Sequence, residues 1–242
     1  MRFAPRCLHP IQEGECDMRP LGDAGSEIPI VFIVDDNVSV RESLELLILS
    51  AGWQPQTFAS AEDFLVRPRI DDPSCLVLDV TLPNLNGLEL QKRIVDRIDM
   101  PIIFITGYGD VPTTVQAMKA GAVEFLTKPF SDEVLLNAIR QATERSRTAL
   151  AHEAEMHTRR DRHASLTPRE REIMALVVSG LLNKQTAFEL GISEVTVKAH
   201  RGQVMRKMQV ESLAELVRVA AALDVPLGAH ARYQRIANTI GQ

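Results

Sequence analysis

The chain has 242 residues, of which 45% are hydrophobic and 24% charged, the composition of an ordinary globular protein with room for two small domains. No run approaches the roughly 20 apolar residues that a bilayer-spanning helix needs. The net charge of −5 is unevenly spread: residues 28–131 carry 14 acidic and 8 basic side chains, whereas residues 165–222 carry 6 and 8. A basic second half of this kind indicates contact with nucleic acid.

The N-terminal segment and the cysteines indicate the compartment. Residues 1–27 are rich in proline, glycine and charge and lack an apolar stretch, so we expect a disordered N-terminal extension rather than a secretory signal peptide. The cysteines, Cys7, Cys16 and Cys75, are odd in number and lack metal-site spacing, which indicates a reducing environment. These features predict a cytoplasmic protein.

Strand-like apolar runs alternate with helical patterns between residues 28 and 145. The first run, Ile30 to Val34, is continuous and β-branched, as in a strand that is buried on both faces. Further strands are expected at 54–58, 75–79, 101–107 and 123–129, and helices are expected to begin at or after Ser39, Ser60, Leu88, Val111 and Ser131. This alternation predicts an α/β domain with a doubly wound, five-stranded parallel sheet.

Polar side chains stand where four of these strands end. They are Asp35 and Asp36, Asp79, Thr106 and Lys128, which a parallel sheet delivers to the same edge. Three neighbouring carboxylates repel one another unless a cation lies among them, and oxygen ligands of this kind favour Mg²⁺. Asp79 would then act as a nucleophile towards a phosphoryl group. Lys128 would neutralise the phosphoryl oxygens, and the Thr106 hydroxyl would donate a hydrogen bond to one of them.

The segment after Ser131 connects this domain to a second one. Apolar residues lie at helical spacing as far as residue 145, after which the pattern thins among Glu, Arg and His. The segment 146–164 is therefore either an extended helix or a charged linker, and we expect a helical linker. A coiled coil that forms a dimer is an alternative, although its apolar positions are not sustained over three heptads.

Helix signals return after residue 165 and predict an all-α domain of four helices. Thr167 is an N-cap residue followed by Pro168 at the first helical position. Asn183, Ser193 and Ser212 are expected to cap the next three helices. In the fourth helix, the residues expected to face inward are Leu213, Leu216, Val217 and Ala220. Two short helices joined by a glycine-containing turn predict a helix-turn-helix.

The third of these helices, residues 194–208, has two different faces on a helical wheel. Val197, Val204 and Met208 share one face and should lie in the core. The opposite arc is expected to meet DNA bases and consists of Val195, Lys198, Ala199, Gly202, Gln203 and Arg206. Thr196, Lys207 and Lys184 are better placed for phosphates. Gly202 indicates either close approach to DNA or simple sequence drift, and Arg201 should snorkel or pair locally rather than read bases.

Residues 28–145 resemble a response-regulator receiver domain. The resemblance is carried by the acidic pair Asp35-Asp36, by Asp79, by Thr106 and by Lys128-Pro129. It implies the flavodoxin-like strand order 2-1-3-4-5. It also implies a cis bond between Lys128 and Pro129.

The same resemblance assigns roles to individual residues. It makes Asp79 the phosphoacceptor and Thr106 a switch hydroxyl. It implies that Mg²⁺ is bound by Asp36, Asp79 and the backbone carbonyl of Thr81, with Asp35 acting mostly through water. Phe125 falls at the position of the family's switch aromatic, with a plain core aromatic as the alternative.

Residues 165–224 resemble the LuxR-type helix-turn-helix of the NarL/FixJ regulators, close to the FixJ branch. The resemblance is carried by the segments 166–172, 183–187, 190–193 and 196–201, which read LTPRERE, NKQTA, LGIS and TVKAHR. Family members often have a larger polar side chain where Gly202 stands. The tail, residues 225–242, has no recognisable motif.

Together these features predict a transcriptional regulator of a two-component system, not an enzyme. A sensor histidine kinase would phosphorylate Asp79 in the presence of Mg²⁺, and the change would promote a homodimer on promoter DNA, with RNA polymerase as a further candidate partner. Three alternatives stay open: a constitutive DNA-binding regulator, an adaptor whose second domain binds protein, and a Mg²⁺-dependent aspartate-nucleophile phosphatase. Such phosphatases typically carry a second Asp where this chain has Thr81.

Overall fold

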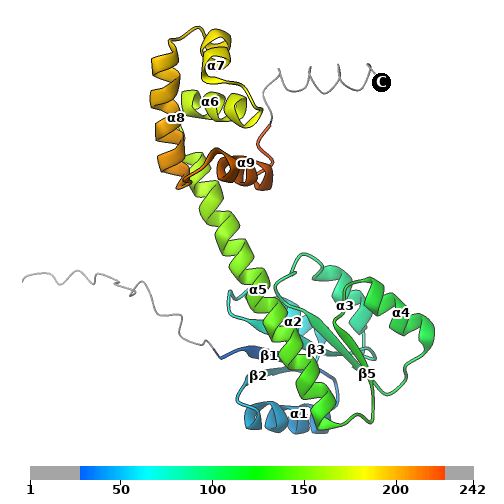
Figure 1. Cartoon of the computed structure of the whole chain (residues 1–242). Coiled ribbons are helices and arrows are strands. Elements are labelled where there is room, and N and C mark those ends of the chain that lie inside the picture. Colours follow the sequence, from blue (N-terminus) through cyan, green and yellow to red (C-terminus); the bar gives the residue numbers. More distant parts are fainter. Residues whose placement is uncertain (1–27, 227–242) are drawn as a thin grey trace, which may run out of the picture.

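A computed structural model describes residues 28–226, and Figure 1 shows an α/β domain and a helical domain joined by one long helix. The predicted N-terminal extension and nearly all of the predicted tail lie outside the described residues. Within the described part, no helix is both long enough and apolar enough to cross a membrane.

The α/β domain is built on a five-stranded parallel sheet. Its strands are β1 (Ile30–Val34), β2 (Gln54–Phe58), β3 (Ser74–Asp79), β4 (Ile102–Thr106) and β5 (Glu124–Thr127). The order β2-β1-β3-β4-β5 confirms the predicted fold. The three central strands β1, β3 and β4 are buried along their whole length, which explains why they read as continuous apolar runs.

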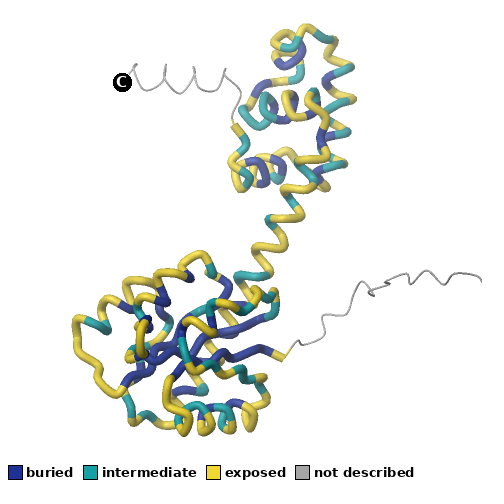
Figure 2. The backbone as a smooth tube through the Cα atoms, turned by 180° about the vertical axis from the view of Figure 1, so that it is seen from behind, coloured by how far each residue is buried: buried dark blue, intermediate teal, exposed yellow. Residues whose placement is uncertain are grey.

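Helices cover both faces of the sheet. These helices are α1 (Val38–Ser50), α2 (Ala61–Val66), α3 (Gly87–Arg93), α4 (Val111–Lys119) and α5 (Asp132–Ala164). Helices α1 and α5 pack on one face, where Leu44 and Ile139 belong to the same buried cluster. Helices α2, α3 and α4 pack on the other, around Phe64, Leu90 and Ala117. The dark central strands in Figure 2 lie between these two layers.

The helix starts follow from capping residues in the sequence. Side-chain oxygens of Asn37, Ser60, Asn86, Asp110 and Ser131 accept hydrogen bonds from backbone N–H groups in the first turns of α1 to α5. Each cap satisfies an N–H group that has no partner within its helix. Every cap follows a strand or the loop after it, so each helix begins near the edge where the parallel strands end.

Helix α5 runs without interruption through 33 residues, so the expected helical linker at 146–164 is a continuation of the last receiver helix. Ser146, which is fully buried, anchors it to the base of the sheet. Its hydroxyl accepts a hydrogen bond from the Ser74 N–H at 2.9 Å and donates one to the carbonyl oxygen of Asp99. Arg69 adds an ion pair with Asp99 at 2.9 Å and one with Glu153 at 3.4 Å.

The helical domain consists of α6 (Pro168–Val178), α7 (Asn183–Leu190), α8 (Glu194–Met208) and α9 (Leu213–Ala222). Thr167, Ser193 and Ser212 cap their helices as predicted. The prediction for Asn183 is wrong by one position, because the N-cap of α7 is Leu182. The Gln185 side chain accepts from the Leu182 N–H at 2.8 Å instead.

The inward face of α9 also differs from the prediction. Leu216 and Ala220 are buried, but Leu213 and Val217 are 38% and 40% exposed. Val219 takes their place in the core. The helix is therefore rotated by part of a turn, and two apolar side chains remain on the surface.

Candidate functional site

The predicted acidic cluster is present at the carboxyl edge of the sheet. Asp35 and Asp36 follow β1 directly, and Asp79 is the last residue of β3. One carboxylate oxygen from each lies within 4.8 Å of the others. Asp35 is fully buried, Asp79 is 6% exposed and Asp36 is exposed, so the cluster has one open side.

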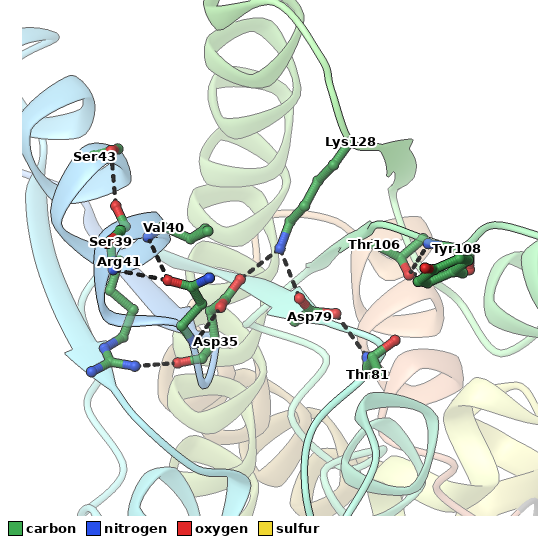
Figure 3. Close-up of polar contacts among 11 residues, drawn as sticks. Asp35, Ser39, Val40, Arg41, Ser43, Asp79, Thr81, Thr106, Tyr108 and Lys128 are labelled. Atoms are coloured by element: carbon green, nitrogen blue, oxygen red, sulfur yellow. Dashed lines mark hydrogen bonds and ion pairs between the residues drawn. The ribbon is translucent and has the colours of Figure 1, made fainter.

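Lys128 joins two of these carboxylates. Its Nζ atom lies 2.7 Å from Asp35 Oδ2 and 2.7 Å from Asp79 Oδ2, as Figure 3 shows. The peptide bond between Lys128 and Pro129 is cis, as the resemblance implied. The Lys128 N–H donates to the Thr106 carbonyl oxygen at 2.7 Å, which fixes the lysine just beyond β5 beside the end of β4.

Charge and burial determine the protonation of this pair. Burial raises the pKa of the Asp79 carboxyl group, while hydrogen bonds from Lys128 and from the Thr81 N–H oppose that rise. Burial also opposes the charge of Lys128, but its ion pairs with Asp35 and Asp79 raise its pKa above the ordinary value. The lysine therefore stays cationic at neutral pH and lies in contact with the candidate nucleophile.

The cluster fits a divalent cation. Asp35, Asp36 and Asp79 supply three carboxylates, and Lys128 compensates one of those charges. Thr81 is exposed, and its N–H donates to Asp79 Oδ1 at 2.7 Å, so its backbone lies against the same carboxylate. Carboxylate and carbonyl oxygens with room for water are the ligands that Mg²⁺ prefers.

Thr106 and Phe125 lie near the cluster at the ends of β4 and within β5. Thr106 is fully buried, and its hydroxyl donates to the Tyr108 carbonyl oxygen at 3.1 Å and accepts from the Tyr108 N–H at 3.2 Å. Phe125 is half-buried and its ring centroid lies 6.0 Å from that of Phe104. In this conformation the Thr106 hydroxyl thus binds its own loop rather than Asp79 (Figure 3).

Two neighbours of Asp35 were not anticipated from the sequence. The Arg41 guanidinium donates to the Asp35 carbonyl oxygen at 2.6 Å, and the Asn37 N–H donates to Asp35 Oδ1 at 2.8 Å. Both fix the loop that carries the acidic pair. The only sequence signal is that Arg41 stands on the first turn of the helix that follows the pair.

The predicted base-reading arc is on the surface of α8. Val197, Val204 and Met208 are buried as expected. On the opposite side Val195, Lys198, Ala199, Gly202 and Arg206 are exposed and Gln203 is half-buried. A side chain at Gly202 would meet nothing within 4 Å, so glycine is not required there by the fold of the free protein.

Several polar residues of the domain already have partners. Arg201 Nη1 donates to Asn183 Oδ1 at 3.2 Å, so Arg201 pairs within the domain with the first residue of α7. Arg206 donates to Gln203 on the arc, and Thr196 shares a hydrogen bond with Ser193. The Lys207 ammonium lies 2.7 Å from the buried Glu170, so a phosphate would have to share it. Lys184 is exposed on the first turn of α7.

Comparison with known proteins accounts for both halves of the chain. Residues 31–140 match the family described as response regulator receiver domain, and residues 164–220 match bacterial regulatory proteins, luxR family. The chain belongs to the NarL/FixJ family of two-component response regulators. Members of this family are phosphorylation-dependent transcriptional regulators, so the chain works with a kinase and binds DNA.

Individual relatives are similar in sequence to this chain over most of its length. Nodulation protein W of Bradyrhizobium diazoefficiens is 48% identical over 81% of this chain and 87% of its own. Response regulator protein TodT of Pseudomonas putida is 42% identical over 89% and 92%, and transcriptional regulatory protein FixJ of Rhizobium meliloti is 44% identical over 79% and 95%. Among solved structures, response regulator StyR is 46% identical, has a TM-score of 0.70, and covers 81% of this chain and 99% of its own.

Proposed function

We propose that Asp79 receives the phosphoryl group in this response regulator and that the exposed arc of α8 reads the DNA target. The observation that carries the first part is the Lys128 ammonium, placed 2.7 Å from both Asp35 and Asp79. A cation held there stabilises the negative charge that develops on a phosphoryl group in transfer. Of the three carboxylates, Asp79 contacts this cation and is also partly exposed towards the open side of the cluster, whereas Asp35 is fully buried.

The transfer needs one bond to form and one to break. An Asp79 carboxylate oxygen bonds to phosphorus, and the bond from phosphorus to a nitrogen of the kinase phosphohistidine breaks. The leaving nitrogen keeps the electron pair. Asp36, Asp79 and the Thr81 carbonyl would hold Mg²⁺, with Asp35 acting through water, and the ion would supply charge neutralisation for the phosphoryl oxygens.

Phosphorylation then changes a nearby surface. The Thr106 hydroxyl, now bonded to the Tyr108 backbone, would leave that loop for a phosphoryl oxygen, and Phe125 would follow it inward. The surface that changes is formed by α4, β5 and the start of α5. Val111 and Val115 on α4 are 76% and 44% exposed, as is suitable for a face that pairs two chains into a dimer.

DNA recognition is proposed for α8 placed in the major groove. Lys198 and Arg206 carry donors suited to guanine, Gln203 to adenine, and Val195 and Ala199 offer apolar contact. Thr196, Lys184 and Lys207 would hold phosphates, and Gly202 would allow the backbone to come close. RNA polymerase is the further partner that such a regulator would meet at its promoters.

The test of the phosphoacceptor is phosphorylation of the full chain by acetyl phosphate with Mg²⁺, followed by intact-mass measurement. We expect one added phosphoryl group in the wild-type chain and in the control Asp71→Asn, which changes an exposed aspartate in the loop before β3. Asp79→Asn should show none. Phosphorylation that persists in Asp79→Asn would refute the assignment.

The test of the switch is sedimentation velocity with Mg²⁺, with and without beryllofluoride as a phosphoryl mimic. A shift from monomer to dimer that Asp79→Ala abolishes supports the proposal. Absence of a shift in a chain that does accept phosphate would mean that the signal does not act through dimerisation.

A further inference from the structure

Apart from α8, the last turns of α5 carry arginines whose side chains have no partner among the described residues. Arg159 is paired with Glu155 at 2.5 Å, and Asp161 lies 3.7 Å from His157. The side chains of Arg160 and Arg162 form no hydrogen bond or ion pair within the described residues. Arg160 is exposed and Arg162 is half-buried. Two positive charges therefore lie at the end of the linker without an ion-pair partner in residues 28–226.

This end of α5 lies against the foot of α8. The Lys207 ammonium donates to the carbonyl oxygen of Ser165, the C-cap of α5, at 3.2 Å, and Leu166 packs in one buried cluster with Val204 and Met208. Figure 1 shows α5 arriving at the lower end of α8. Arg162 is three residues before Ser165, so it stands within one helical turn of the junction.

Basic residues lie close to the junction of α5 and α8 on both helices. Arg206, on the exposed arc, is next to Lys207 in the last turn of α8. Arg160 lies only about 7.5 Å along the α5 axis from Ser165, at a rise of about 1.5 Å per residue. A duplex seated on α8 carries one phosphate charge for about every 1.7 Å of its length, so its backbone continues past the foot of that helix.

We propose that Arg160 and Arg162 bind phosphodiester groups of the DNA that flanks the site read by α8. This inference rests on the proposed role of α8. Planar guanidinium groups form paired hydrogen bonds with phosphate oxygens, which suits arginine better than lysine at such a contact. Contacts of this kind add affinity and fix orientation without reading sequence. They would also hold α5, and with it the receiver domain, in a set direction relative to the duplex.

The experiment compares the double variant Arg160→Gln/Arg162→Gln with the control Arg93→Gln/Arg147→Gln. The control removes the same charge from exposed arginines on α3 and on an earlier turn of α5. The probes are a duplex enriched from a random library by the beryllofluoride-activated full chain and a scrambled duplex of equal composition. Fluorescence anisotropy gives Kd for both between 50 and 200 mM NaCl.

Each lost phosphate contact should reduce the slope of log K against log salt by about 0.9, so the double variant should lose about 1.8. We expect binding at 100 mM NaCl to weaken about tenfold or more on both duplexes, with the ratio between them unchanged. The control should keep the wild-type slope.

Three results would overturn the inference. An unchanged slope in the double variant would show that Arg160 and Arg162 do not touch DNA. A loss confined to the enriched duplex would mean base contacts rather than phosphate contacts. Failure of the wild-type chain to enrich any duplex would remove the proposed role of α8 itself, and so the basis of the inference.

Discussion

Removing one oxygen atom from Ser146 should break the two hydrogen bonds that hold α5 to the sheet. Ser146→Ala removes the buried hydroxyl that joins the Ser74 N–H to the Asp99 carbonyl, and leaves both backbone groups inside the protein without it. A buried polar group without a partner costs about 1–3 kcal/mol. For two such groups, with some relaxation, we expect a loss of about 2–4 kcal/mol. That is a large share of the roughly 5–15 kcal/mol typical of a domain.

The matched control is Thr148→Ala on the same helix. The Thr148 hydroxyl is exposed and donates only to the Glu144 carbonyl of its own helix, so its loss should cost no more than about 0.5 kcal/mol. The assay is urea unfolding followed by the fluorescence of Trp53, the single tryptophan, which lies in the receiver domain. A Ser146→Ala chain as stable as Thr148→Ala would refute the reasoning.

Three further predictions concern the helical domain and the end of α5 next to it. Gly202→Ala should stabilise the free chain by about 1 kcal/mol, since a methyl group meets only open space, and DNA binding that weakens nonetheless would identify close approach to the duplex. Burial and the charge of Arg171 lower the pKa of His163. The unfolded chain therefore binds a proton at this histidine more readily, so its contribution to stability should be complete above about pH 6.5 and decrease as the pH falls below that value. In thermal unfolding, His163→Gln should remove this decrease. The hydrogen bond from Lys207 lowers the pKa of Glu170. The contribution of Glu170 to stability should therefore be present above about pH 4.3 and decrease in more acidic solution. Glu170→Gln should make the unfolding temperature less dependent on pH in that acidic range.

Most of the fold follows from local patterns in the sequence. Continuous apolar runs identify the buried strands, and capping residues such as Ser131 and Thr167 mark where helices begin. The acidic cluster was predictable for the same reason, because a parallel sheet places all its strand ends at one edge. The alternation of strands and helices therefore fixes both the fold and the neighbourhood of Asp79.

The contacts that could not be predicted join residues far apart in the chain. Ser146 meets the backbone of Ser74, 72 residues away, and Lys207 meets Glu170, 37 residues away. Nothing in a local pattern distinguishes these side chains from exposed ones. The error at α9 is similar, since Leu213 and Val219 are both apolar and only the packing of the neighbouring helices selects Val219 for the core.

The exposed arc of α8 bears on how phosphorylation controls DNA binding. Figure 1 places the helical domain at the far end of α5, and Lys198, Ala199 and Arg206 are exposed in this arrangement. A signal that uncovers α8 would therefore have little to uncover, whereas a signal that pairs two chains would bring two α8 helices onto neighbouring half-sites.

This distinction gives a prediction on two duplexes, one with a single half-site and one with a pair. Beryllofluoride should leave the Kd of the full chain for the single half-site unchanged within about twofold, and should tighten binding to the pair by a factor of about 10²–10⁴ through the effective concentration of the second domain. The Asp79→Ala chain is the control and should show no response on either duplex. If the single half-site gains as much as the pair, the receiver covers α8 before activation, and release rather than pairing carries the signal.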